Sequence, residues 1–249
     1  MIDVYVLSLI LVIIYYVVMP LVVNPLIGVV QKRKNLSAPP ITEKIRVDSY
    51  IKIIAWGWGS TLAVFILCFL AGISFNDIGL RGISLSKNIW ITSITLIVYG
   101  VMLIANIYCI IAYLVSPEYR EEQKEEFAKS TMNEATKSLV PRSKKEKRYH
   151  LFVSLTAGIG EEIDFRGFLI FLLRAVFPNT SMLLVLLVAS VIFGIGHTYQ
   201  GFVKGIIRTT MWGFLFCSLF LVTDSIIPGM LLHFIGNFES AFQLSENTE

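Results

Sequence analysis

Long runs of hydrophobic residues make up most of the chain, and shorter polar segments separate them. Seven of these runs reach the length of about 20 residues that an α-helix needs to cross a bilayer. The pattern therefore predicts an all-α integral membrane protein with about seven transmembrane helices. We place these helices at Val4–Val23, Tyr50–Phe75, Asn88–Val115, Leu151–Phe177, Met182–Phe202, Gly205–Thr223 and Ile226–Leu244.

The composition agrees with this class of protein. Of the 249 residues, 55% are hydrophobic and 16% are charged, and the mean hydropathy is +0.70. The first hydrophobic run has no basic segment before it and no small-residue cleavage site after it, so we interpret it as a retained span. Cys68, Cys109 and Cys217 all lie within hydrophobic runs, which indicates small core residues and not disulfides or metal ligands.

Lysine and arginine are distributed unevenly between the loops. The segment 31–49 carries five and the segment 116–150 carries nine, whereas the opposite loops contain only Arg81 and Lys87, with Arg174 near a helix end. By the positive-inside rule we expect a multi-pass protein of the cell membrane with its amino terminus outside and its carboxyl terminus in the cytoplasm. The basic loops should contact anionic lipid head groups and not nucleic acid, because glutamates interrupt the longer loop.

The longer basic loop divides the chain into two parts. We expect residues 1–149 to form an amino-terminal three-helix membrane region with cytoplasmic loops, and residues 150–249 to form a four-helix catalytic core. The intramembrane polar residues that are suited to chemistry all lie in the second part.

Four ionisable side chains interrupt the fourth hydrophobic run, between Gly158 and Gly167. They are Glu161, Glu162, Asp164 and Arg166. A charge in the bilayer interior costs about 3 kcal/mol on insertion scales, so such residues usually serve a function. At α-helical spacing Arg166 lies one turn after Glu162 and can pair with it, whereas Glu161 points to a different neighbour. One carboxylate can therefore be held by the arginine while the other acts.

Two histidines and an asparagine lie in the fifth and seventh runs. His197 follows two glycines, and His233 and Asn237 share one helical face. At the rise of an α-helix, Glu161 and His233 lie about 15 and 16 Å from the cytoplasmic side, and His197 and Asn237 about 8 and 10 Å. All four depths fall in the same half of the membrane, so these side chains can meet.

Such a set of side chains can hydrolyse an amide with water as the nucleophile. A buried carboxylate beside an imidazole can take a proton from water, and burial moves a glutamate toward the pKa that a base needs. A second imidazole and a carboxamide can donate hydrogen bonds to the developing oxyanion. No serine or cysteine has a base at motif spacing, so we expect no covalent nucleophile.

Three short motifs carry this chemistry. Glu161–Arg166 fits EExxxR, Phe193–His197 fits FxxxH, and His233–Asn237 fits HxxxN. Each motif alone is weak, but the three in this order on successive hydrophobic runs are specific. Over about residues 151–237 the chain resembles the CAAX protease and bacteriocin-processing family (CPBP, or Abi), which consists of intramembrane proteases.

The resemblance implies a role for each motif residue. Glu161 would be the base that works with His233 on the water, and His197 and Asn237 would form the oxyanion site. The pair Glu162 and Arg166 would hold the geometry.

One residue within the first motif is unusual. Asp164 occupies a variable position where similar sequences more often have an apolar residue. It could help to keep Glu161 partly protonated, or it could face a water-filled vestibule without effect.

The resemblance leaves the substrate open. Similar proteins trim prenylated CAAX proteins, or process or confer immunity to bacteriocin and signal peptides. A compact chain with short loops resembles the bacterial group more closely, which disfavours a prenylated substrate. We therefore expect an endopeptidase that acts on a membrane-associated peptide or protein.

Two other classes of function use similar residues. The same fold could act as a non-catalytic immunity or peptide-binding protein, with the polar cluster serving as a pocket. Buried glutamate, histidine and arginine also build proton relays in transporters. A relay would spread such groups across both leaflets, whereas here they converge at one depth.

A zinc site is the rival mechanism. Glu161, His197 and His233 form an acceptable ligand set, because catalytic zinc takes three protein ligands and a water. However, no close-spaced ligand pair is present, and no acidic residue in the fifth run can orient His197. A metal site would also give no chemical role to Asn237, which in the metal-free scheme donates to the oxyanion. We therefore expect a metal-free site and no cofactor.

Overall fold

The computed structural model describes residues 42–129 and 139–243. The first predicted span, Val4–Val23, and the last residue of the seventh, Leu244, lie outside the described residues. Every regular element in the described part is a helix, as the sequence predicts.

The first two described helices have clear capping residues. Helix α3 spans Glu43–Ala71 and begins where the Thr42 side chain accepts a hydrogen bond from Ile45 N; it ends at Gly72, whose φ of 68° is left-handed. It therefore starts and ends before the predicted boundaries. Helix α4 spans Ile89–Val115, and Asn88 caps it by accepting from Ile91 N.

The fourth hydrophobic run forms one continuous helical segment that changes type along its length. After the charged helix α5 (Pro117–Lys129) come α7 (Lys144–Leu155), the π-helix η2 (Thr156–Leu169) and α8 (Ile170–Val176). The helix starts earlier than predicted because Ser143 and Glu146 form a reciprocal capping box.

The end of the fifth predicted span and the start of the sixth form irregular turns. Helix α9 covers Met182–Gly196 and is followed by the 3₁₀ turn η3 (Thr198–Gln200) and the short π-helix η4 (Phe202–Ile207). Helices α10 (Arg208–Thr223) and α11 (Ile227–Gln243) complete the described chain. The fifth run is thus shorter as a helix than predicted, and His197 lies just beyond its end.

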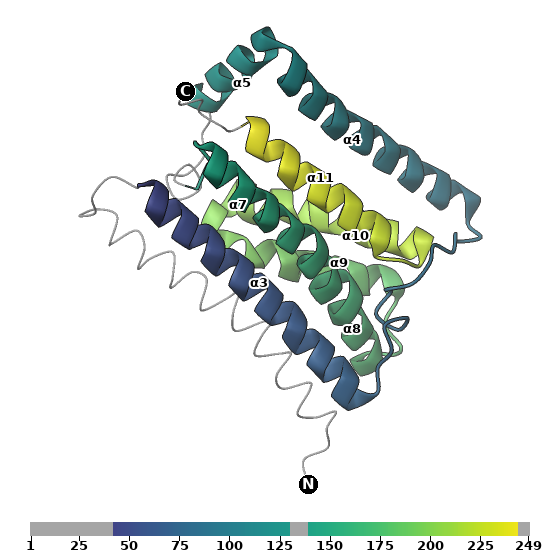
Figure 1. The fold of residues 1–249 in the computed structure, drawn as a ribbon. Helices are drawn as coiled ribbons and strands as arrows, with labels where there is room; N and C mark the ends of the chain where they lie inside the picture. The colour runs from purple at the N-terminus through teal and green to yellow at the C-terminus, as the bar shows by residue number, and fades with distance from the viewer. Residues whose placement is uncertain (1–41, 130–138, 244–249) are drawn as a thin grey trace.

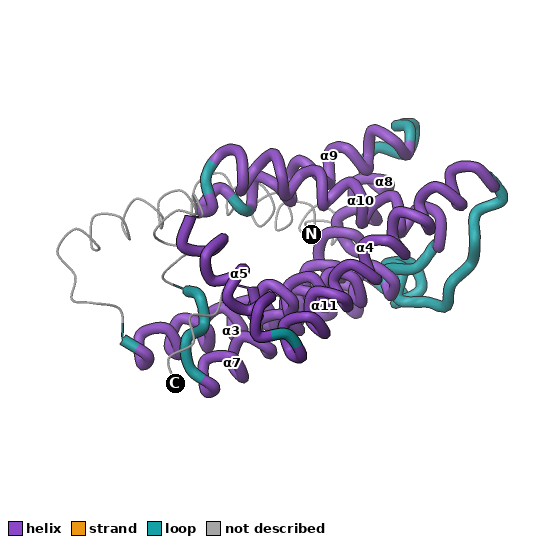
Figure 2. Tube along the Cα trace, turned by 90° about the horizontal axis from the view of Figure 1, so that it is seen from above, coloured by secondary structure: helices purple, strands orange, loops and turns teal. Residues whose placement is uncertain are grey.

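The helices pack in two layers. Helices α3, α7 and α11 lie side by side, and α9 and α10 pack against each other behind them (Figure 1). Viewed along the perpendicular direction, the α9–α10 pair is separate from the layer of α3, α7 and α11 (Figure 2). The π-helix η2 contacts α3 on one side and α11 on the other, so it occupies the centre of the fold.

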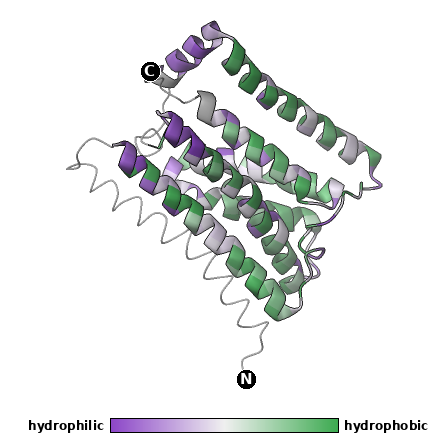
Figure 3. Cartoon of the chain, viewed as in Figure 1, coloured by the Kyte–Doolittle hydropathy of each residue, from purple (hydrophilic) through white to green (hydrophobic). Residues whose placement is uncertain are grey.

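Three of the described helices are long and apolar enough to cross a membrane: Glu43–Ala71, Ile89–Val115 and Gly205–Thr223. Helix α9 is apolar but shorter. Apolar residues cover α3 and α4, whereas hydrophilic residues gather on α5 and at the start of α7 (Figure 3). These features are those of a membrane protein; the count of seven spans stays a prediction.

Helix α3 joins the site segment through buried polar contacts, although it precedes the proposed core in sequence. Arg46 Nε donates to Glu146 Oε1 at 2.8 Å, and the Glu146 side chain is fully buried. Because removing either partner would leave an uncompensated buried charge, this pair fixes α3 against α7. The division at residue 149 stays a prediction, but α3 packs directly on η2 and α7.

On the opposite end of the molecule, the loop 73–88 is tied to the helices. Asp77 accepts hydrogen bonds from the Ser74 hydroxyl and backbone N–H, which hold the pKa of its carboxyl below the usual range. Arg81 forms an ion pair with Asp224, the left-handed residue that ends α10.

Glycines let three neighbours approach η2 closely. A Cβ at Gly158 would lie 2.7 Å from the backbone of Phe234, and one at Gly167 would lie 2.6 Å from the carbonyl oxygen of Ile78. A Cβ at Gly160 would lie 2.8 Å from the hydroxyl of Thr61. The absence of side chains at these positions therefore sets the distances from η2 to α11, the loop and α3.

We expect Gly158→Ala to destabilise the protein, because the added methyl group meets backbone atoms of α11 that cannot rotate away. Gly100→Ala is the matched control, since no atom lies within 4 Å of a Cβ built there and alanine favours the helix. Thermal unfolding in detergent should show a lower midpoint for the first variant and an unchanged or higher one for the second. Equal midpoints would mean that α11 does not approach η2 this closely.

Candidate active site

The two glutamates lie on a π-helix and not on the regular α-helix that the sequence suggests. Helix η2 extends over 14 residues, and both its ends continue into α-helix without a capping side chain. A π-helix has i→i+5 hydrogen bonds and usually appears as a single turn, often at a functional site. The pairing expected for Glu162 and Arg166 survives this change, because residues four apart still share a face.

A buried chain of polar contacts runs from Arg166 through Glu162 to His233. Arg166 Nη1 lies 3.1 Å from Glu162 Oε1, and the same oxygen lies 2.8 Å from His233 Nδ1. Both side chains of the ion pair are 1% exposed. Glu162 thus joins η2 to α11, and the predicted pair with Arg166 is present.

Two aromatic rings enclose the guanidinium of Arg166. Its Cζ lies 4.0 Å from the centroid of the Phe193 ring and 5.0 Å from that of Phe216. The faces of aromatic rings attract cations, and this attraction strengthens when water is excluded. The phenylalanine of the FxxxH motif therefore stabilises the arginine of the EExxxR motif.

Glu161 meets both histidines. Its Oε2 lies 4.0 Å from His197 Nε2 and 3.8 Å from His233 Nε2. The side chain as a whole is 32% exposed, but Oε2 itself is buried and has no hydrogen-bond partner among the described residues. Three helical segments, η2, the end of α9 and α11, thus bring together three of the four side chains that the sequence places at similar depths.

The partners of each histidine determine which ring nitrogen carries the hydrogen. His197 Nδ1 lies 2.8 Å from the carbonyl oxygen of Phe193, which can only accept, so Nδ1 is the donor. His233 Nδ1 likewise faces the carboxylate of Glu162, which is ion-paired. In the neutral form of each imidazole, Nε2 then carries a lone pair and faces Glu161.

The loop after α9 holds His197 in place. Its backbone ends α9, and a Cβ at Gly205 would lie 2.2 Å from the His197 carbonyl oxygen. Gly201 has a φ of 97°, which glycine adopts without strain and which turns the chain into η4. His197 is therefore fixed by a tight turn, which the expectation of an unbroken helix did not include.

Asn237 lies one turn after His233 on α11, as expected. Its carboxamide makes no hydrogen bond to another residue in the described part of the chain; its backbone carbonyl accepts from Ser240. The structure thus places Asn237 on the predicted helix, and within the described residues no hydrogen bond joins its side chain to Glu161 or the histidines.

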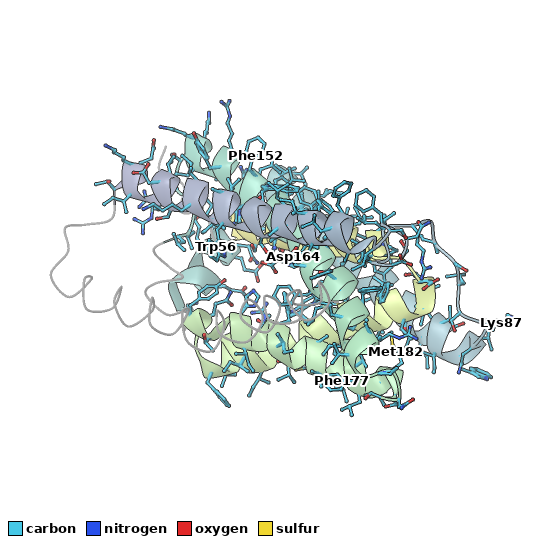
Figure 4. The ribbon with its side chains drawn as sticks, turned by 90° about the horizontal axis from the view of Figure 1, so that it is seen from below. Trp56, Lys87, Phe152, Asp164, Phe177 and Met182 are labelled. Atoms are coloured by element: carbon cyan, nitrogen blue, oxygen red, sulfur yellow. The ribbon has the colours of Figure 1, made fainter. Side chains whose placement is uncertain are left out.

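Asp164 faces α3. It is 4% exposed, accepts a hydrogen bond from the Ser60 hydroxyl, and lies in the interior of the molecule next to α3 (Figure 4). The expectation of a water-filled vestibule around Asp164 is therefore wrong. The residue contributes instead to the attachment of η2 to α3.

Three residues of the site carry no motif signal. Phe216 stacks on the His233 ring, and a Cβ at Gly229 would lie 3.0 Å from Glu162 Oε2. A Cβ at Gly213 would lie 3.4 Å from Arg166 Nη2. Gly229 precedes His233 by one helical turn, and this spacing of a small residue beside a polar one is the signal that could have indicated it.

A zinc ion would find some of its requirements met here. The sequence did not reveal a hydrogen-bond partner for His197, and in the structure this partner is the Phe193 carbonyl. Both histidines therefore have the hydrogen-bond acceptor that zinc-bound imidazoles need on the second ring nitrogen. Within the described residues, however, no group of three or more histidine, cysteine, aspartate and glutamate side chains has the arrangement of a metal site.

We expect Arg166→Ala to reduce both folding and activity, because it leaves Glu162 buried without its cation. Breaking a buried pair costs about 3–5 kcal/mol. Arg174→Ala, at the exposed end of the same segment, is the control and should have no such effect. Folded yield and thermal midpoint in detergent measure the difference. A normal midpoint for Arg166→Ala would show that the pair with Glu162 does not support the fold.

Comparison with known proteins finds a match between part of the chain and a protein-family model. No match is found among curated proteins or among solved structures. Residues 148–238 match the family model described as Rce1-like, type II CAAX prenyl endopeptidase. The matched segment contains all three motifs and every side chain that converges in the site. Residues 148–238 therefore match the CAAX protease and bacteriocin-processing family, as the motifs predict.

Proposed function

We propose that the protein is an intramembrane endopeptidase in which Glu161 activates a water molecule to hydrolyse a peptide bond. The observation that supports this most directly is the convergence of His197 Nε2 and His233 Nε2 on one oxygen of Glu161. Distances of 3.8 and 4.0 Å are too long for direct hydrogen bonds but suit a polar atom held between the three groups.

In this proposal, His233 and Glu161 together remove the proton from the water. Glu162 holds the Nδ1 side of the ring, so the lone pair on Nε2 is available to accept a hydrogen bond or a proton. The carboxylate–imidazole arrangement resembles that of other hydrolytic sites, in which a carboxylate orients a histidine by binding the ring nitrogen that does not take part in proton transfer. Arg166 forms an ion pair with Glu162 in its buried position.

His197 and Asn237 would stabilise the oxyanion. For His197 this role requires the imidazolium form, because Nδ1 already donates to Phe193 and only a protonated Nε2 can donate as well. The Asn237 carboxamide has no hydrogen-bond partner among the described residues and would donate once substrate is bound.

The substrate in this proposal is a peptide or protein at the membrane. The family model is described as a type II CAAX prenyl endopeptidase, whereas the short loops favour the bacterial bacteriocin and signal peptide group. Reconstituted protein should be offered matched peptides with and without a prenyl group. Cleavage of the unprenylated peptide would support the bacterial type of substrate, and cleavage only of the prenylated peptide would exclude it.

We also propose that the end of the molecule that carries α5 and the start of α7 faces the cytoplasm. Hydrophilic residues gather at this end, including the basic residues 144, 145, 147 and 148. A cysteine introduced at Asn179, at the other end, should react with an impermeant reagent in intact cells. If this cysteine reacts only after the cells are opened, the topology is the reverse of the proposed one.

We expect Glu161→Gln to abolish cleavage while the protein stays folded. The amide keeps the shape of the side chain but cannot take a proton, and loss of a general base typically lowers the rate by about 10²–10⁴-fold. Glu122→Gln, an exposed residue of α5, is the control. Full activity of Glu161→Gln in vesicles would contradict the catalytic role and favour a non-catalytic peptide-binding protein.

Metal dependence is tested separately, because the orientation of both histidines also suits zinc. Bound zinc would lower the pKa of its water, and Glu161, His197 and His233 would hold it. We expect purified, active protein to contain well under one equivalent of zinc by elemental analysis and to keep its activity in a strong chelator. Stoichiometric zinc, with activity lost on chelation and restored by zinc, would assign the reaction to the metal.

A further inference from the structure

Phe216 lies outside the three motifs and contacts two of them. It belongs to α10, between the fifth and seventh hydrophobic runs, and its side chain is 4% exposed. In the sequence it is one of many apolar residues in a membrane span. Its position in the fold, in contact with both His233 and Arg166, distinguishes it from the other apolar residues of α10.

The ring of Phe216 stacks on the imidazole of His233. The centroids are 5.0 Å apart and the planes differ by 17°. A hydrogen bond from Nδ1 to Glu162 fixes one point of the imidazole but still allows the ring to tilt about that bond. A stacked ring removes this freedom, because a tilt would separate the two faces.

The same ring lies 5.0 Å from the guanidinium carbon of Arg166. Arg166 and His233 are the two ends of the contact chain through Glu162. Phe216 thus contacts the residue that holds Glu162 and the residue that Glu162 orients. Trp212, one turn earlier on α10, stacks on Phe216 at 5.9 Å and supports it.

We propose that Phe216 is a positioning residue that sets the plane of the His233 imidazole, so that Nε2 is directed at Glu161. A leucine would fill most of the same volume but would offer no flat face to the imidazole and no π-face to the arginine. The role of Phe216 in catalysis rests on the proposed function of His233; its effect on the ring does not.

Histidine-selective isotope labelling tests the effect on the ring directly. The chain has three histidines, His150, His197 and His233, so the spectrum is simple, and single His→Gln variants assign it. A proton above the face of a phenyl ring resonates upfield. We expect Phe216→Leu to move the His233 Hε1 resonance downfield, while Phe216→Tyr, which keeps the ring, preserves its position.

Phe214→Leu is the matched control. Phe214 lies two positions earlier on the same helix, packs against the apolar core, and should leave the His233 resonance unchanged. If Phe216→Leu does not fold, Phe216→Met replaces it, since methionine fills the space without a ring. An unchanged His233 resonance in the folded ringless variant would overturn the proposal.

Peptide cleavage in vesicles provides the second measurement. We expect Phe216→Leu to lower kcat by about two- to tenfold with KM unchanged, which is the range that one aromatic pair contributes. Phe216→Tyr should retain most of kcat. If the wild-type protein cleaves nothing, the proposed function fails, yet the resonance shift still decides whether Phe216 positions His233. A change in KM with kcat unchanged would overturn the positioning role.

Discussion

The buried ion pair between Glu162 and Arg166 is the interaction on which the site depends. Taking two charges out of water is costly, and the cost is tolerated only where the geometry and the surrounding groups compensate for it. Here Phe193 and Phe216 enclose the cation, and the His233 imidazole donates to the anion. The pair thereby requires α9, α10 and α11 to lie in fixed positions around η2.

The centre of the fold could be predicted from sequence, because its main interaction is local. Glu162 and Arg166 are four residues apart, and any helix brings such a pair together. The convergence of Glu161, His197 and His233 followed from helix length and membrane depth, which constrain membrane proteins more strongly than soluble ones. The family match over residues 148–238 agrees with the same motifs.

The details that the sequence did not reveal depend on contacts between distant segments. The π-helical form of η2 accompanies close approaches at its glycines, and no local pattern shows which neighbour fills the space beside a glycine. Asp164 was difficult to interpret for the same reason, since its partner Ser60 is on a helix more than a hundred residues away. The end of α9 before His197 is a separate case, because it accompanies a local turn that ends at Gly201.

The two histidines differ in what keeps them aligned. His197 is oriented by the carbonyl of Phe193, one turn back on its own helix, whereas His233 is oriented by Glu162 and Phe216 from two other segments. Helix α11 therefore carries the half of the site that exists only when the helices are assembled. Local opening of a single helix costs less free energy than global unfolding. Detachment of α11 alone would thus separate His233 from Glu161 while His197 kept its orientation, so a ligand that loosened or clamped this one helix would control the whole site.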